Sequence, residues 1–178
     1  RNQIVQERIK MIAALVAVLS KKEYDNKGNR PTHLAIELLG KLRADEEKVI
    51  TILLSKLTFV PKGGRKREEL PIEFDYVSAV ALMKIGSPTV PALVQEISTT
   101  DNAERRELAA WIIMQIEGKE QASHRFGDRI KSMADSRNPD RHEKSIERFT
   151  AAKNHIENWK ARFRNPMAIE QPSKKDSP

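Results

Sequence analysis

The stretch ALMKIGSPTVPALVQEI, residues 81–97, decides the fold of this chain. Gly86 and Pro88 end a first apolar helix, because glycine tolerates the dihedral angles of a helix terminus and proline cannot continue a helix. Pro91 then lies in the first turn of a second helix, where its missing N–H leaves no hydrogen bond unmade. The segment therefore predicts two helices that are joined by a short turn.

Apolar residues recur at intervals of three and four along most of the remaining chain, which is typical of amphipathic helices. Thr32, Asp45 and Asp101 are the expected N-caps of three of these helices, because short polar side chains accept hydrogen bonds from the first free N–H groups. Taken over the whole chain, the pattern predicts helices at residues 2–22, 32–42, 45–57, 76–85, 91–97, 101–117, 119–134 and 139–164.

Residues 58–75 interrupt this pattern with two prolines and the pair Gly63–Gly64, which predicts an inserted loop. Residues 165–178 are too short and too polar to pack and are expected to form a flexible tail. The remaining residues, 1–164, are enough for one domain with a continuous core. Charged residues make up 32% of the chain and aromatic residues 5%, a balance that favours helices over a sheet-rich fold.

Three similar segments, LGKL, LMKI and IMQI, begin at Leu39, Leu82 and Ile113 and so lie 43 and 31 residues apart. The longer interval contains the loop at 58–75. Such spacing is typical of helical repeats, in which one pair of helices cannot bury its apolar face alone. Successive pairs are therefore expected to stack, each one in contact only with its neighbours.

Residues 81–97 also resemble the HEAT-like repeat, in which Ala-Leu-Gly-x-Ile-Gly is followed by a short turn and Val-Pro-Ala-Leu. Met83 departs from this pattern at the usual glycine, whereas Gly40 keeps the glycine in the preceding unit. The resemblance, to the PBS-lyase-type and armadillo-like helical repeats, covers about residues 8–134. It implies an all-α solenoid of about three antiparallel helix pairs, preceded by a half-repeat helix and closed by a C-terminal capping helix at 139–164.

The sequence contains no pattern that is typical of a catalytic or metal site. It has no cysteine, which excludes disulfides, thiolate metal ligands and cysteine nucleophiles within the chain. His142–Glu143 begins a zinc-protease-like string, but Ile146 stands where the second histidine is required. A nucleophile elbow, a dinucleotide fingerprint and a P-loop are absent as well. We therefore expect no catalytic residue, no cofactor and no metal.

The net charge of +7 is concentrated at the two ends of the chain. Residues 1–31 carry seven basic and three acidic side chains, and residues 119–164 carry twelve and seven. The basic residues alternate with acidic ones, which is typical of solvated helical faces. Some of them are nevertheless candidates for binding phosphate or an acidic partner, on a glycine-containing loop tip and on two helices: Lys62, Arg65, Lys66, Arg67, Arg105, Arg106, Arg125 and Arg129.

Repeat architecture without catalytic motifs favours a non-catalytic protein-interaction scaffold, with another protein or a peptide as the partner. The basic residues support one alternative, a nucleic-acid-binding module similar to the HEAT-like DNA alkylation-repair glycosylases. A more remote alternative is a bilin-lyase-like enzyme, because bilin lyases also contain HEAT-like repeats. The longest apolar run, Met11–Leu19, is shorter than the roughly 18–20 residues of a membrane-spanning helix, so no membrane span is expected.

The last helix carries one apolar stripe at intervals of three and four: Ile146, Phe149, Ala152, Ile156, Trp159 and Phe163. The stripe is expected to cover the last repeat, since an uncapped end of a repeat stack is insoluble. Self-association through this stripe is the alternative. The sequence begins at Arg1 rather than at a methionine, which predicts a fragment or a processed form. A cytoplasmic chain and an exported chain that has lost an upstream signal both fit these features.

Overall fold

The computed structural model describes residues 2–21, 30–61 and 72–160, and in these ranges every regular element is helical. The predicted all-α class is therefore confirmed. The eight α-helices of these ranges are α1 (Asn2–Leu19), α3 (Arg30–Lys41), α4 (Glu47–Ser55), α5 (Val77–Ile85), α6 (Val90–Thr99), α7 (Ala103–Glu117), α8 (Lys119–Ala134) and α9 (Glu143–Glu157). Short 3-10 helices are found at Ile72–Asp75, Ser87–Thr89 and Pro139–His142.

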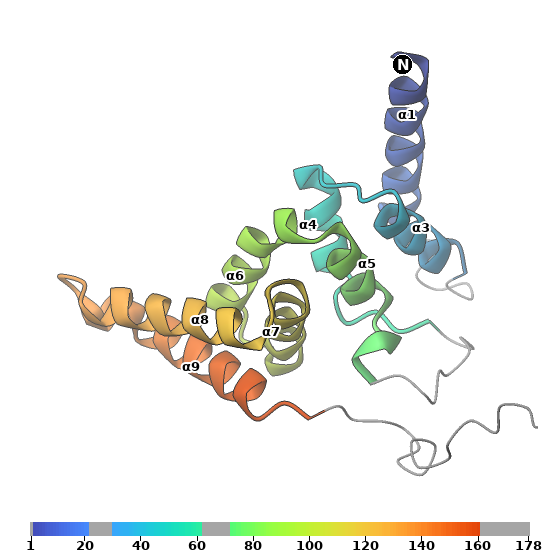
Figure 1. Cartoon of the computed structure of the whole chain (residues 1–178). Coiled ribbons are helices and arrows are strands. Elements are labelled where there is room, and N and C mark those ends of the chain that lie inside the picture. Colours follow the sequence, from blue (N-terminus) through green and yellow to red (C-terminus); the bar gives the residue numbers. More distant parts are fainter. Residues whose placement is uncertain (1, 22–29, 62–71, 161–178) are drawn as a thin grey trace, which may run out of the picture.

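Five of the helices that follow α1, namely α3 to α7, pack in two rows, which Figure 1 shows from one side. In one row α3 packs on α5 and α5 packs on α7, whereas in the other row α4 contacts α6. α1 precedes both rows and packs mainly on α3. Helices of the first row are thus neighbours in space, although a helix of the second row separates them in the sequence.

α7 is the centre of the apolar core. Seven consecutive residues, Leu108–Met114, are buried, as expected for a helix that other helices cover on nearly every side. Trp111 is fully buried, and the ring of Phe74 meets it edge-on with 5.3 Å between the ring centroids. Trp159 is only partly buried. One tryptophan thus lies in the core and the other at its margin.

The C-terminal end of the molecule is closed by α8 and α9, which form the most extensive helix–helix contact in the described residues. α9 also packs on α6 and α7, so the last helix lies beside the second row. Phe149, Ala152 and Ile156 of its stripe are buried, and the ring of Phe149 lies 5.9 Å from that of Phe126 in α8. This part of the stripe covers neighbouring helices, as a capping helix does.

The two helices of residues 81–97 diverge from the antiparallel arrangement that was predicted. α5 and α6 change direction by 111° at the turn between them, so the pair is closer to perpendicular than to antiparallel. Gly86 ends α5 with a φ of 88°, and the 3-10 helix Ser87–Thr89 leads directly into α6. The short link sets the angle between the two helices, and the apolar pattern contains no information about that angle.

Glycines marked the C-terminal ends of two helices correctly, whereas the predicted N-caps at the starts of helices were displaced. Gly118, with a φ of 89°, separates α7 from α8 as expected. The cap of α7 is Asn102, whose Oδ1 accepts a hydrogen bond from the backbone N–H of Arg105 over 3.0 Å. Asp101, the predicted cap, lies one residue earlier and accepts a hydrogen bond from Arg148 instead. The prediction was therefore wrong by one residue.

Two further predicted N-caps are also displaced. α3 begins at Arg30, because a proline at its second position is compatible with a first helical turn. Thr32 therefore lies inside the helix and is buried. α4 begins after Glu46, so Asp45 lies one residue too early to cap it.

The last helix is shorter than the predicted range 139–164. Its first residues form the 3-10 helix Pro139–His142, and α9 ends at Glu157. The side chain of Asn158 donates a hydrogen bond to the backbone carbonyl oxygen of Asn154 over 2.9 Å. Such a side-chain contact competes with the continuation of the helix, which explains the earlier end.

α3 and α5 approach each other closely at Gly40. A Cβ atom placed on Gly40 would lie 2.8 Å from Cα and 3.0 Å from Cβ of Ala81. Carbon atoms in favourable contact are about 3.5–4.0 Å apart, so only glycine fits at this crossing without displacement. Gly40 is also the glycine at which this chain follows the HEAT-like pattern.

The predicted inserted loop, 58–75, is described only at its two ends. Residues 58–61 follow α4, and Ile72–Asp75 form the 3-10 helix that precedes α5. The predicted tail at 165–178 and the four candidate residues of the loop tip lie outside the described residues: Lys62, Arg65, Lys66 and Arg67.

Candidate functional site

α1 carries one apolar stripe along its length. Its members alternate at intervals of four and three residues: Val5, Ile9, Ile12, Val16 and Leu19. Ile12, Val16 and Leu19 are buried, whereas Val5 and Ile9 are 54% and 49% exposed. Because this alternation places all five side chains on one side of a helix, the exposed and the buried residues belong to one continuous seam.

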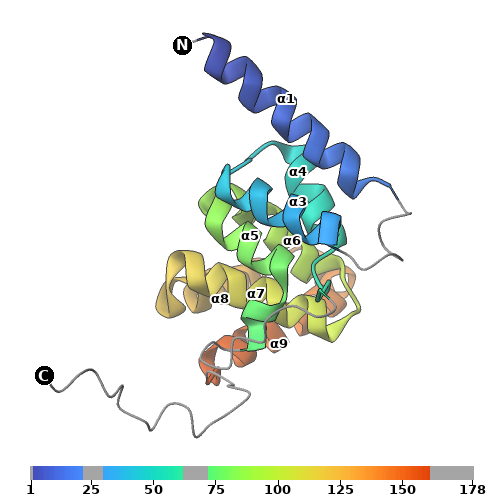
Figure 2. The ribbon, with the colours of Figure 1, turned by 90° about the vertical axis from the view of Figure 1, so that its right-hand side faces the viewer.

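The N-terminal half of α1 projects from the molecule. Figures 1 and 2, which are related by a turn of 90°, both show it extending beyond the other helices. Every side chain from Gln3 to Glu7 is exposed, and the buried residues of α1 begin only at Ile12. The neighbouring helices α3 and α4 therefore cover only the later turns of the stripe.

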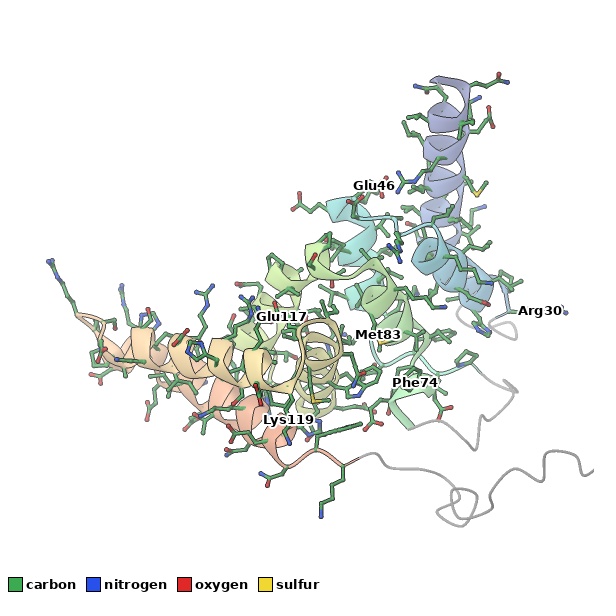
Figure 3. All side chains as sticks on the ribbon, viewed as in Figure 1. Arg30, Glu46, Phe74, Met83, Glu117 and Lys119 are labelled. Carbon is green, nitrogen blue, oxygen red and sulfur yellow. The ribbon has the colours of Figure 1, made fainter. Side chains whose placement is uncertain are left out.

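Arg8 fastens α1 to the link between α3 and α4 at the edge of the covered part. Its guanidinium group donates hydrogen bonds to the backbone carbonyl oxygens of Leu42 and Arg43, over 3.4 and 3.3 Å. It also pairs with Glu46 over 3.4 Å. Glu46 directly precedes α4 and is labelled in Figure 3. The turns of α1 before Arg8 thus project from an anchored base.

The projecting part of α1 exposes large apolar side chains. Val5 and Ile9 lie on the side of the seam, and we call these two side chains the α1 apolar face. Two further apolar side chains, Ile4 and Met11, are about half exposed or more on another side of α1. Ile4 is the most exposed of them, at 77%. Leu34 and Leu38, one helical turn apart on the adjacent α3, are exposed as well. Exposed apolar groups of this kind mark interaction sites, because covering them removes apolar surface from water.

Two of the predicted partner-binding arginines form contacts within the chain. Arg105 donates hydrogen bonds to Glu96 over 2.7 Å and to the backbone carbonyl oxygen of Leu54 over 3.0 Å, so it joins α7 to α6 and α4. Arg125 donates two hydrogen bonds, of 2.9 and 2.6 Å, to the carboxylate of Glu117, and these raise the pKa of Arg125. Both guanidinium groups stabilise the packing of the chain itself.

The side chains of the other two predicted arginines on helices, Arg106 and Arg129, form no hydrogen bond or ion pair with any residue in the described part of the chain. Arg129 is exposed on α8, whereas Arg106 is half-buried near the start of α7. The predicted residues thus differ in what they can do: two are occupied internally, and two remain able to bind an anion.

A shallow depression of about 310 Å³ lies between the segment that begins α7 and one side of α9. One of its charged residues is Arg148, which donates hydrogen bonds to the backbone carbonyl oxygen of Ser98 over 2.6 Å and to Asp101 over 2.5 Å. The six lining residues are Asp101, Arg106, Lys144, Glu147, Arg148 and Ala151.

The charges around this depression stabilise anions. The hydrogen bond from Arg148, followed by its charge, lowers the pKa of Asp101, and the charges of Lys144 and Arg106 lower this pKa further. The sequence analysis identified Arg106 but missed the depression. Its lining comes from residues 101–106 and 144–151, which meet only in the folded chain.

The described residues contain no group of three or more His, Cys, Asp or Glu side chains that could hold a metal ion. His124 pairs with Asp128 over 3.0 Å, and His155 lies 3.8 Å from Glu107. No single helix in the described ranges is both long and apolar enough to cross a membrane. α5 and α6 reach the necessary length and composition only together, as a bent pair.

Comparison with known proteins shows no relative of this chain. It matches no protein-family model, and it has no significant match among curated proteins or among solved structures. Function is therefore inferred from the surface and the packing of the chain alone.

Proposed function

We propose that this chain is a non-catalytic protein-interaction scaffold, organised as a stack of HEAT-like helix pairs, and that its α1 apolar face binds an amphipathic helix of a partner protein. The observation that carries the proposal is the exposure of Val5 and Ile9 in the same stripe as three buried residues. On the projecting turns of α1, the partner helix takes the place that α3 and α4 have further along.

The spacing of the stripe indicates the shape of the partner. Side chains at alternating intervals of four and three form the seam along which two helices pack side by side. Helices cover the buried half of the stripe, and the exposed half continues the same spacing. A second helix therefore matches the free half better than an extended strand, whose side chains repeat every two residues.

The free half of the seam supports weak, reversible binding. Full burial of a Val or Ile side chain contributes about 1.5–3 kcal/mol, and half-exposed side chains have about half of this still to gain. Val5 and Ile9 therefore contribute roughly 1.5–3 kcal/mol before the costs of association are subtracted. Contacts of the partner outside these two side chains must supply the rest, so we expect a dissociation constant roughly in the millimolar range.

The packing order of the helices supports the repeat part of the proposal. α3, α5 and α7 follow one another in one row, and α4 is followed by α6 in the other, so that contacts run between successive pairs. The tight crossing at Gly40 falls on the glycine that HEAT-like units retain. Two features depart from a regular stack, namely the 111° turn between α5 and α6 and the position of α9 beside α6.

A synthetic amphipathic helix tests the proposal. The probe is a labelled peptide of about three heptads, with leucine at the two seam positions of each heptad and Glu and Lys elsewhere. We expect saturable binding to the purified chain, measured by fluorescence anisotropy. The double variant Val5→Lys/Ile9→Lys should weaken this binding at least about tenfold, because it places two charges on the seam.

The matched control adds the same two charges on the other side of α1, as Gln3→Lys/Gln6→Lys. All four positions are exposed, so both variants should unfold at the temperature of the parent chain. Absence of peptide binding, or an equal loss in both variants, would overturn the proposal. If the parent chain is a dimer and only Val5→Lys/Ile9→Lys makes it dissociate, the α1 apolar face binds a second copy of the chain instead.

A further inference from the structure

We infer that the depression between α7 and α9 binds a carboxylate side chain of an acidic peptide segment. This site is independent of the α1 apolar face, because α1 and the pair of α8 and α9 lie at opposite ends of the series of helices (Figure 1). The two surfaces also differ in chemistry, since one is apolar and five of the six residues that line the other are charged.

Two cations without a partner line the depression from different helices. Arg106 lies near the start of α7, and Lys144 is the second residue of α9. Neither side chain forms a hydrogen bond or an ion pair with another residue of the ranges that the structure describes. Arg106 is half-buried, so an anion that reaches it displaces little water and gains a charge-assisted hydrogen bond.

Arg148 makes the site rigid. Its two terminal nitrogens donate hydrogen bonds to Ser98 and Asp101, which holds α9 against the segment between α6 and α7. The Arg148 side chain is only 15% exposed, so water screens its charge less than that of a fully exposed side chain. Arg148 therefore places a fixed positive charge beside Arg106 and Lys144.

Asp101 shows how the depression affects a carboxylate. Its side chain is 89% exposed, and its pKa is nevertheless lowered, first by the hydrogen bond from Arg148 and then by the charges of Arg148, Lys144 and Arg106. The ionised form of a carboxylate is therefore favoured at this position. A second carboxylate, supplied by a ligand, meets the same two free cations.

The size and the charges of the lining favour a peptide over a nucleic acid. The depression has a volume of about 310 Å³, at the lower end of the range for ligand sites. Asp101 and Glu147 belong to the same lining and repel a continuous phosphate backbone. A single carboxylate between Arg106 and Lys144 avoids this repulsion. Two further arginines, Arg105 of α7 and Arg125 of α8, are already paired with Glu96 and Glu117.

Octaglutamate is the probe for this site, and octaglutamine and a short DNA duplex are its comparison ligands. Fluorescence anisotropy of the full chain at low ionic strength should show binding of octaglutamate and not of octaglutamine. Arg106→Gln/Lys144→Gln should weaken octaglutamate binding about tenfold, because both free cations are lost. Glu147→Gln should strengthen it about twofold, because it removes a repelling charge. Backbone NMR shifts on titration should be largest at residues 101–106 and 144–151.

The control variant Arg129→Gln/Lys131→Gln removes the same charge from exposed positions of α8 and should leave octaglutamate binding unchanged. Equal weakening in both double variants would show unspecific attraction and overturn the proposal, as would the absence of octaglutamate binding. A duplex that binds more tightly than octaglutamate and displaces it would assign the depression to nucleic acid. None of these outcomes affects the helix-peptide experiment on α1, because that experiment uses an apolar seam.

Discussion

α1 and α7 both carry long apolar runs, Met11–Leu19 and Leu108–Met114, but their surroundings differ. All residues of Leu108–Met114 are buried. In Met11–Leu19 only Ile12, Val16 and Leu19 are buried. The reason is the number of neighbours, because α7 packs on α5, α6, α8 and α9, whereas α1 packs on α3 and α4.

The difference shows that apolar composition and burial are separate properties. A helix that is apolar on nearly every side needs neighbours on nearly every side, and α7 has them. α1 has apolar side chains for a further neighbour that the described chain does not supply. The proposed partner helix is the consequence of this mismatch.

The largest expected effect is on the free energy of unfolding, when one isoleucine of each helix is replaced by alanine. Ile112→Ala in α7 should lower the free energy of unfolding by about 2–5 kcal/mol, because it opens a cavity in a fully buried position. Ile9→Ala in α1, where the side chain is 49% exposed, should change it by less than about 0.5 kcal/mol. Urea denaturation of both variants measures the difference. Similar losses would mean that the start of α1 is covered in solution.

The next comparison concerns the arginines that fasten the two helices. Arg105→Met should lower the free energy of unfolding by about 1–3 kcal/mol, because it leaves Glu96 and a backbone carbonyl group without their donor in a part-buried site. Arg8→Met should cost less than about 1 kcal/mol, since Arg8 and Glu46 are both about 40% exposed. Thermal unfolding at matched ionic strength measures both. An equal or larger cost for Arg8→Met would contradict the difference in burial.

A substitution at the crossing of α3 and α5 tests whether close packing extends from α7 toward α1. Gly40→Ala should destabilise the chain by about 1–3 kcal/mol, because the new methyl group meets the backbone of Ala81. Gly127→Ala, in α8, should stabilise it by up to about 1 kcal/mol, because nothing lies within 4 Å of the new methyl group and alanine favours a helix. Opposite signs are the expected result. A Gly40→Ala variant as stable as the parent chain would indicate loose packing between α3 and α5.

The smallest expected effect is a pH dependence at the start of α7, for which α1 has no counterpart in the described residues. The pKa of Asp101 is lowered in the folded chain, so its ion pair stabilises the fold above the ordinary aspartate pKa and is lost as pH falls through the folded value. Asp101→Asn should therefore be less stable than the parent chain at neutral pH. The difference should disappear at a pH well below 3.8, the ordinary aspartate value. Urea midpoints across this range measure it, and a pH-independent difference would refute the assignment to the ion pair with Arg148.

Much of the helical content was predictable because its signals are local. Apolar spacing identified every α-helix of the described ranges, and Gly86 and Gly118 end α5 and α7 as expected. The N-caps were less predictable, because neighbouring polar residues compete for the same position. Asn102 caps α7 although Asp101 is a comparable residue type, and only the direction of the chain between α6 and α7 distinguishes them.

The candidate sites were predicted less well than the helices. Arg105 and Arg106 are adjacent basic residues, and nothing in their sequence distinguishes them. One is bonded to Glu96 and Leu54, whereas the other lines an open depression. The α1 apolar face was also missed, because an exposed and a buried apolar stripe have the same spacing.

The amino-acid sequence by itself determined that this chain is helical and where α5, α7 and α8 end. These properties follow from backbone dihedral preferences and from apolar periodicity, which act within a few residues. The tertiary structure alone decided the 111° turn between α5 and α6, the position of α9 beside α6, the exposure of the start of α1 and the meeting of Arg106 with Lys144. Each of these depends on contacts between segments that are distant in the chain, so no local pattern encodes them.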